Sequence, residues 1–242
     1  MPFTFSHPAV VLPFNYLSKR RISLTALVIG SITPDFEYFI RMKVASYYSH
    51  YWAGLFWFDL PLGLLLLLIY NHIVKDKLID HLPAYFNKRF SQFKNSGKSY
   101  SSSYIITIVV CILIGAASHI FWDSFTHPTG YFVKHIHHLS SRVLVGHSAI
   151  PFYNIVQHLS SLTGAIIILY AIAQLPIGQS TQNNKIIAYW VKILAVTLLV
   201  LIIRLLTGLK LHEYGDVIVT AFSGMLIGLI IISAISPAKQ MA

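Results

Sequence analysis

Two histidines and one aspartate are spaced four residues apart in the stretch SHIFWDSFTHPTG, which follows a long apolar run. They are His119, Asp123 and His127. A helix turns by about 100° per residue, so a step of four drifts by only about 40° and places the three side chains in one stripe. Two imidazoles and a carboxylate on one face are a ligand set that suits zinc or a similar divalent ion. The stretch therefore predicts part of a metal site.

Other candidate ligands lie elsewhere in the chain, and ionisable side chains at membrane depth are costly enough to indicate a functional site. The metal ligands expected from the sequence are His7, Asp35, His50, His119, Asp123, His127 and His158. Asp35 and Glu37 are the two candidates for a catalytic general base. Simpler roles stay open for some of these residues. His119 and Asp123 would also form a buried hydrogen-bonded pair, and His127 precedes Pro128, where a helix usually ends.

The chain that carries these residues has the composition of an integral membrane protein. Of its 242 residues, 55% are hydrophobic and only 11% are charged, with a mean hydropathy of +0.65. Soluble domains carry roughly a quarter charged residues. Apolar runs of the roughly 20 residues that span a bilayer occur near 55–74, 104–122, 160–177, 187–207 and 214–236. The expected fold class is all-α, a polytopic helical membrane protein of about five spans plus an N-terminal helical hairpin.

The basic residues predict how the chain is oriented. The net charge is +10, but Lys and Arg are spread over short loops. This distribution fits the positive-inside rule and argues against a nucleic-acid-binding face. The basic loop 75–103 is therefore expected in the cytoplasm and the histidine-rich segment on the outer face of a bacterial inner membrane. A single membrane domain over 1–242 is expected, with the hairpin and first ligands in 1–54, the core in 55–160 and C-terminal helices in 161–242.

The first 40 residues do not fit a simple span. Residues 8–18 are too short to cross, basic residues at 19–21 interrupt them, and the chain is apolar again from 22 until Asp35. A helical hairpin satisfies both halves, because its basic tip can reach a charged leaflet. Such a hairpin would bring His7 level with Asp35. The topology places His50 and the 119–127 stripe on that same face.

Four stretches of the chain resemble a known family: MPFTFSHPAVVLP, GSITPDFEYF, SHY and GAASHIFWDSFTHPTG. They resemble the bacterial membrane family called domain of unknown function 4184, which is similar to a larger group of membrane-bound metal-dependent hydrolases. The shared pattern is an N-terminal His, a Gly-x-x-x-Pro-Asp turn, a later His and a Gly-x-x-x-His-x-x-x-Asp segment. The matches here are His7, Gly30 to Asp35, His50, and Gly115 to Asp123. The resemblance covers most of the first 160 residues and implies a metal site.

A remoter similarity is to zinc-dependent phospholipase C and the single-strand-specific zinc nuclease, helical enzymes that bind three zinc ions. Their ligand order is His, Asp, His, His-x-x-x-Asp, His and then His-x-x-x-Glu or Asp. The order from His7 to His127 reproduces the first six. The last pair differs, since neither His147 nor His158 has a carboxylate four residues later. The resemblance implies one to three divalent ions, zinc before others, with the last carboxylate missing or supplied by a residue such as Glu37.

The expected function is hydrolysis of a phosphoester in a membrane lipid or lipid-linked head group, because metal-bound water becomes hydroxide and paired ions clamp a phosphoryl group. The expected partner is that lipid, with no nucleic acid, and the oligomeric state stays open. A transporter of metal ions or protons and a structural protein with a stabilising metal are the alternatives. Transporters need polar groups along a path through the bilayer, and the charged residues in the last three apolar runs are few: Lys192, Arg204 and Asp216. This favours an enzyme.

Overall fold

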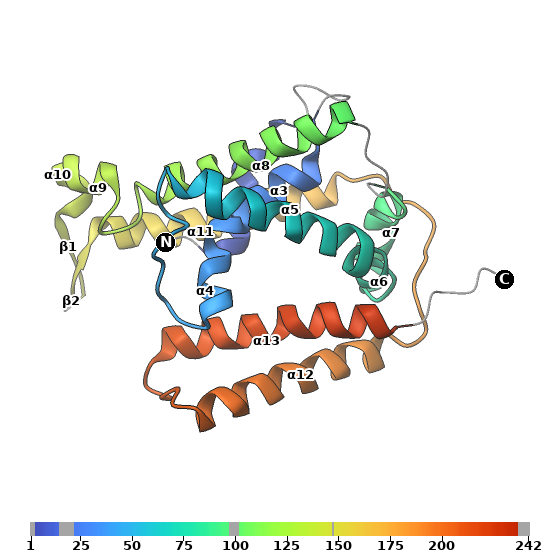
Figure 1. Ribbon diagram of the computed structural model, residues 1–242. Coiled ribbons are helices and arrows are strands. Elements are labelled where there is room, and N and C mark those ends of the chain that lie inside the picture. Colours follow the sequence, from blue (N-terminus) through green and yellow to red (C-terminus); the bar gives the residue numbers. More distant parts are fainter. Residues whose placement is uncertain (1–2, 15–21, 97–101, 147, 237–242) are drawn as a thin grey trace. The chain divides into compact units, whose positions relative to one another are not determined.

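The computed structural model describes residues 3–14, 22–96, 102–146 and 148–236, and these are mostly helical, with one short two-stranded hairpin (Figure 1). Five helical stretches among them are long and apolar enough to cross a membrane. They are Leu55–Asp80, Tyr104–Asp123, Phe152–Ala173, Ile186–Leu206 and Tyr214–Ile235. The predicted fold class, an all-α multi-pass membrane protein with five spans, is confirmed.

The third span and the segment before it differ from the sequence expectation. Helix α11 (Phe152–Ala173) begins at Phe152 and not near 160, because its first turns carry polar side chains that an apolar run does not count. Ahead of it, β1 (Arg142–Val145) and β2 (Ser148–Pro151) pair as an antiparallel hairpin. No strand was expected there. The connection between the second and third spans is thus shorter and more ordered than predicted.

The chain folds into two compact units. Unit 1 comprises Met1–Asp35, Tyr48–Leu64 and Ser101–Ala171. Its elements are η1 (Thr4–Ser6), α1 (Pro8–Val11), α3 (Leu24–Ile32), η2 (Thr33–Asp35), the π-helical turn η3 (Leu55–Asp59), the first half of α5 (Leu60–Ile69), α8 (Ser102–Asp123), α9 (Tyr131–His135), α10 (His137–Ser140), β1, β2 and nearly all of α11. The expectation of one membrane domain over the whole chain stays a prediction.

Helices α3 and α8 form the centre of unit 1. A Cβ on Gly30 would lie 2.3 Å from the carbonyl oxygen of Ile112, and one on Gly115 would lie 2.4 Å from that of Leu27. Only glycine permits so close an approach of two backbones. Leu27 lies beside Gly115 and Ser31 beside His119, so the two helices run in the same direction. Their C-terminal ends therefore lie at the same end of the unit.

The N-terminal residues are held in unit 1 by α11. The Ser6 hydroxyl donates to the carbonyl oxygen of Ser161 over 2.9 Å, and the Phe3 amide donates to the Ser161 hydroxyl over 2.9 Å. The short helix α1 also contacts α3, as the hairpin prediction requires. The basic tip of that hairpin, at 19–21, lies outside the described residues.

Unit 2 comprises Phe36–Tyr47, Leu65–Tyr100 and Ile172–Ala242. Its elements are α4 (Phe36–Arg41), the second half of α5, the π-helical turn η4 (Tyr70–Val74), α6 (Lys75–Asp80), α7 (Ala84–Phe90), η5 (Ser91–Phe93), α12 (Ile186–Leu206) and α13 (Tyr214–Ile235). Helices α12 and α13 lie side by side, with Tyr189, Ile193 and Ile232 buried between them (Figure 1). The Tyr189 hydroxyl lies 2.8 Å from that of Ser233, so a polar bond also joins the pair.

Candidate metal centre

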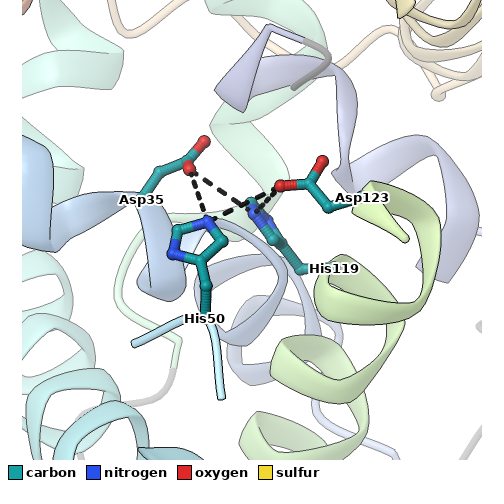
Figure 2. A group of neighbouring side chains, drawn as sticks. All are labelled: Asp35, His50, His119 and Asp123. Carbon is teal, nitrogen blue, oxygen red and sulfur yellow. Dashed lines mark ion pairs between the residues drawn. The ribbon is translucent and has the colours of Figure 1, made fainter. Parts of the chain in front are cut away.

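Four side chains of unit 1 converge on one point (Figure 2). Asp35 ends η2, directly after Pro34, and His50 belongs to the loop before η3. His119 and Asp123 lie on successive turns at the C-terminal end of α8. One ligand atom from each of the four lies within 4.8 Å of all the others. The group is able to hold a metal ion.

The nitrogen and oxygen atoms of this group are evenly spaced. The Nε2 atom of His50 lies 3.4 Å from Asp35 Oδ1 and 3.5 Å from Asp123 Oδ2. The Nε2 atom of His119 lies at the same two distances from the same two oxygens. Hydrogen bonds between nitrogen and oxygen typically measure about 2.7–3.2 Å, so these four separations are too long for good ones. They leave room for an ion between the four atoms.

Burial makes this spacing costly unless a cation is bound. The exposed fractions of Asp35 and His119 are 0%, and that of Asp123 is 5%. Among the described residues, both oxygens of Asp35, the Nε2 atom of His119 and Oδ2 of Asp123 have no hydrogen-bond partner. Buried polar groups are nearly always satisfied, and a buried carboxylate needs a counter-charge. The donor set and its unsatisfied atoms therefore fit a divalent ion.

The other ring nitrogens orient the two histidines. The Nδ1 atom of His119 lies 2.7 Å from the carbonyl oxygen of Ser31, a group that only accepts, so this nitrogen carries the proton. The lone pair is then on Nε2, the atom that faces the carboxylates. The Nδ1 atom of His50 lies 2.9 Å from the hydroxyl of Ser49, which is fully buried. Such hydrogen bonds fix the ring orientation of metal-binding histidines.

Close backbone contacts place these partners. The approach of α3 to α8 at Gly30 and Gly115 is what brings the Ser31 carbonyl to His119. In the loop that carries His50, a Cβ on Gly54 would lie 1.9 Å from the carbonyl oxygen of Tyr48. A side chain at position 54 would therefore open the loop. The glycines thus hold three separate chain segments at the distances that the site requires.

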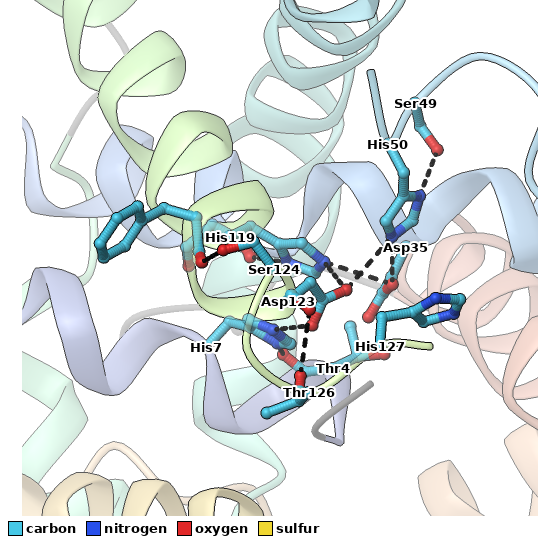
Figure 3. Close-up of polar contacts among 12 residues, drawn as sticks. Thr4, His7, Asp35, Ser49, His50, His119, Asp123, Ser124, Thr126 and His127 are labelled. Atoms are coloured by element: carbon cyan, nitrogen blue, oxygen red, sulfur yellow. Dashed lines mark hydrogen bonds and ion pairs between the residues drawn. The ribbon is translucent and has the colours of Figure 1, made fainter. Parts of the chain in front are cut away.

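His7, which directly precedes α1, lies against this group of four side chains (Figure 3). Its ring stacks on that of His119, with centroids 3.7 Å apart and an interplanar angle of 17°. The Nε2 atom of His7 lies 3.3 Å from Asp123 Oδ1, the carboxylate oxygen that the group of four does not use, and its Nδ1 atom lies 3.2 Å from the Thr4 carbonyl. Burial and the neighbouring His119 lower the pKa of His7.

The pKa values of Asp35 and His50 are shifted by their neighbours in this group. Burial by itself would raise the pKa of the Asp35 carboxyl, but the approach of His119 and His50 outweighs burial and lowers it. Burial by itself would lower the pKa of His50, but Asp123 and Asp35 outweigh burial and raise it. Without a metal, the Asp35 carboxyl would therefore stay charged, and His50 would bind a proton more readily than a free imidazole does.

Three other predicted site residues lie outside the group of four. His127 is half-buried one turn after Asp123, and its Nδ1 atom lies 2.9 Å from the Thr129 hydroxyl. Burial lowers the pKa of its ring. His158 is exposed on α11. Glu37 belongs to unit 2, where its carboxylate accepts hydrogen bonds from Arg41 Nε over 2.8 Å and from the backbone amide of Tyr47 over 2.9 Å.

Sequence reasoning did not find the groups that support the ligands. The Ser31 and Thr4 carbonyls belong to the backbone. Every residue has such a group, so residue type could not predict these two. The Ser49 hydroxyl stands next to His50 in the chain, and this adjacency was a readable signal. Gly30 and Gly115 were noted as parts of a pattern, whereas their physical role, the close contact of two helices, emerges only from the packing.

The comparisons with known proteins give one match. A family model described as Domain of unknown function (DUF4184) matches residues 1–234, nearly the entire chain. No curated protein and no solved structure matches.

Proposed function

The chain belongs to the family described as Domain of unknown function (DUF4184), and we propose that it is a membrane-embedded metal-dependent hydrolase of phosphoesters in lipid or lipid-linked head groups. One observation carries the proposal. Four ligand atoms from two aspartates and two histidines converge in a buried site of a multi-pass membrane protein, with several of those atoms unsatisfied by the described residues.

The spacing of the ligand atoms favours zinc. The edge of a tetrahedron is about 1.63 times its bond length, so zinc bonds of about 2.0–2.2 Å give ligand separations of about 3.3–3.6 Å. The four nitrogen-to-oxygen separations, 3.4 and 3.5 Å, fall in this range, and the two remaining pairs of ligand atoms lie within 4.8 Å. Octahedral magnesium, with bonds of about 2.1 Å, would need neighbouring ligands about 3.0 Å apart, and calcium prefers oxygen ligands alone.

A second ion is supported beside the first. His7 faces an oxygen with each ring nitrogen, although a neutral imidazole donates from only one of them. With its proton on Nδ1 toward Thr4, Nε2 presents a lone pair to Asp123 Oδ1. A second cation held by His7 and Asp123 would relieve this repulsion.

A bound ion of this kind would supply a hydroxide near neutral pH if it also binds a water beside the four protein ligands, and it would supply a positive charge for a phosphoryl oxygen. The residues of the chain would hold this ion and orient the side chains that bind it. Asp35, His50, His119 and Asp123 bind the ion, and Ser31 and Ser49 fix the two rings. Asp35 keeps Oδ2 outside the four measured contacts, and we assign to this oxygen the acceptance of a proton during hydrolysis. Glu37, already bound by Arg41, is the weaker candidate for that role.

The position of the site along α8 supports a lipid substrate. Helix α8 has 22 residues and is therefore about 33 Å long, enough to cross the hydrocarbon core of a bilayer. The basic residues of 75–96, in the stretch that holds α6, α7 and η5, precede its N-terminal end in the chain, and the site lies at its C-terminal end, level with the head groups of one leaflet. The positive-inside rule supports the proposal that this is the outer leaflet, in a bacterial inner membrane.

The test pairs two assays on one purified preparation. Metal content is measured by mass spectrometry, and hydrolysis is measured over a panel of phospholipids and soluble phosphoesters, before and after chelation. We expect stoichiometric zinc, and cleavage that chelation abolishes and added zinc restores. Asp35→Asn should reduce cleavage strongly, whereas His212→Ala, at an exposed histidine of unit 2, should not. Metal flux into proteoliposomes without cleavage of any ester would show that the protein is a transporter and not a hydrolase.

A further inference from the structure

The connection between the second and third spans carries positive charge and no negative charge. No Asp or Glu occurs between Asp123 and Glu213. In α9, α10 and β1, the exposed side chains include Lys134 and Arg142 together with three histidines: His135, His137 and His138. Unit 1 as a whole contains three acidic residues, Asp35, Asp59 and Asp123, and all three are buried. The exposed charge of the 131–151 segment is therefore entirely cationic.

This segment is tied directly to the metal centre. The backbone amides of Phe132 and Val133 donate to the carbonyl oxygen of Ser124, the residue after Asp123, over 3.1 and 3.3 Å. The Phe132 ring stacks on that of Phe125 with centroids 4.0 Å apart. The segment starts where one span ends and leads into the next, so it lies at the membrane face that meets the metal centre.

Exposed apolar side chains are interleaved with the cations. Tyr131 is 63% exposed, Ile136 is 40% exposed and Leu144, on β1, is 78% exposed. Val143, the neighbour of Leu144 on the opposite face of the strand, is 39% exposed, so both faces of the hairpin are open. A two-stranded hairpin alone is marginally stable in water. It needs a further surface to cover these side chains.

We propose that the 131–151 segment is a docking surface for anionic lipid head groups in the leaflet that meets the metal centre. Lys134 and Arg142 bind the head-group phosphates, while Tyr131, Ile136 and Leu144 enter the boundary between head groups and acyl chains. Cations interleaved with aromatic and aliphatic side chains are typical of interfacial elements. An acidic protein or a nucleic acid would satisfy the charges, but neither would cover the apolar side chains of a segment whose two ends enter the bilayer. The proposal does not depend on hydrolysis.

The experiment measures the depth of one side chain in bilayers of two compositions. The full chain, with Cys111→Ser and Leu144→Cys, carries a nitroxide at 144 and is reconstituted in nanodiscs of phosphatidylcholine alone or rich in phosphatidylglycerol. Collision rates with oxygen and with a water-soluble nickel chelate report the depth. We expect the label to enter the apolar boundary in the anionic nanodiscs and to face water more often in the zwitterionic ones.

Charge removal sharpens the test. Lys134→Gln and Arg142→Gln should each lower the docked-to-undocked ratio in anionic nanodiscs about fivefold. The matched control removes two exposed charges of unit 2, with Lys185→Gln and Lys210→Gln, and should leave the ratio unchanged. High salt should lower the ratio of the unmodified segment as Lys134→Gln and Arg142→Gln together do, which separates lost charge from lost folding.

Three results would overturn the proposal. The label at position 144 could stay in water in both lipids, or its depth could be the same with and without the charges of Lys134 and Arg142. In the third, an acidic polypeptide such as polyglutamate, and not lipid, would remove the label from water. Metal content is measured on the same samples. Its absence would count against the metal centre and would leave the docking result unaffected.

Discussion

Each unit of the chain buries a group of polar side chains, and the two groups are satisfied to different extents. In unit 2, Asn87 is 0% exposed, and its amide makes four hydrogen bonds. Nδ2 donates to the Ile79 carbonyl and the Thr181 hydroxyl, and Oδ1 accepts from the Ser180 hydroxyl and the Thr181 amide. In unit 1, Asp35 is equally buried, yet neither oxygen has a hydrogen-bond partner among the described residues.

The difference separates a structural role from a binding role. The amide of Asn87 joins α6, α7 and the segment before α12 with its full hydrogen-bonding capacity, so nothing remains for a ligand. The carboxylate of Asp35 and the ring nitrogens that face it point at a common centre and lack partners there. Burial alone therefore does not indicate a site. Burial with convergent unsatisfied atoms does, because folding would not otherwise compensate the cost of desolvation.

The largest test of this comparison is removal of a central ligand. His119→Ala should reduce bound zinc to background, because it leaves three protein ligands and frees the Ser31 carbonyl. Added zinc should also no longer raise the melting temperature, whereas a ligand at about 1,000 times its Kd stabilises a fold by about 4 kcal/mol. Mass spectrometry and thermal unfolding measure both effects. The matched control is His212→Ala. Equal metal loss in both variants would show that the histidines bind metal without forming a defined site.

Asn87→Ala is the corresponding change in unit 2. It removes four hydrogen bonds and leaves buried partners such as the Thr181 amide unsatisfied, so it should lower the free energy of unfolding by about 2–4 kcal/mol. Zinc content should not change in the folded fraction. Chemical unfolding and metal analysis of one preparation test this. A loss of zinc with little loss of stability would contradict the division of roles between the two units.

Gly115→Ala should disturb the metal centre without touching a ligand. Its Cβ would lie 2.4 Å from the Leu27 carbonyl oxygen, so α3 must move away from α8 and take Ser31 and Asp35 with it. We expect the zinc affinity to fall about 10- to 100-fold, the range for lost supporting contacts. Competition with a fluorescent chelator measures it. Gly224→Ala is the control, because its Cβ would lie 3.0 Å from Cα of Thr197 and would disturb the contact of α13 with α12 in unit 2 instead of that between α3 and α8. Similar losses in both variants would contradict the positioning role.

Ser49→Ala should produce the smallest effect. It removes the hydroxyl that orients His50 and leaves every ligand in place. A weakening of zinc binding by about tenfold is expected, with unchanged stability of the metal-free protein. Ser140→Ala, at an exposed serine of α10, is the comparison variant. Unchanged affinity would show that the His50 ring is oriented by the carboxylates alone.

Features that depend on neighbours along the chain are readable in the sequence. Hydropathy over windows of about 20 residues gave the five spans, because the thickness of a bilayer sets that length. The spacing of His119 and Asp123 placed both on one face of α8, because helical periodicity fixes the relative direction of side chains four residues apart. The start of α11 was missed for a related reason: polar residues at the end of a span lower its hydropathy but do not stop the helix.

Which of the candidate ligands meet depends on how the helices and loops pack in the folded chain. His50 reaches the centre because Gly54 keeps its loop closed, and Asp35 reaches it because two glycines let α3 approach α8. His158, of the same residue type as His119, is exposed on α11, and Glu37, only two residues after Asp35, binds Arg41 in the other unit. Residue type and local periodicity do not determine how a helix is rotated about its axis or how closely it packs against another. Those quantities depend on contacts between residues far apart in the chain, such as Ser31 and His119, and they exist only once the chain has folded.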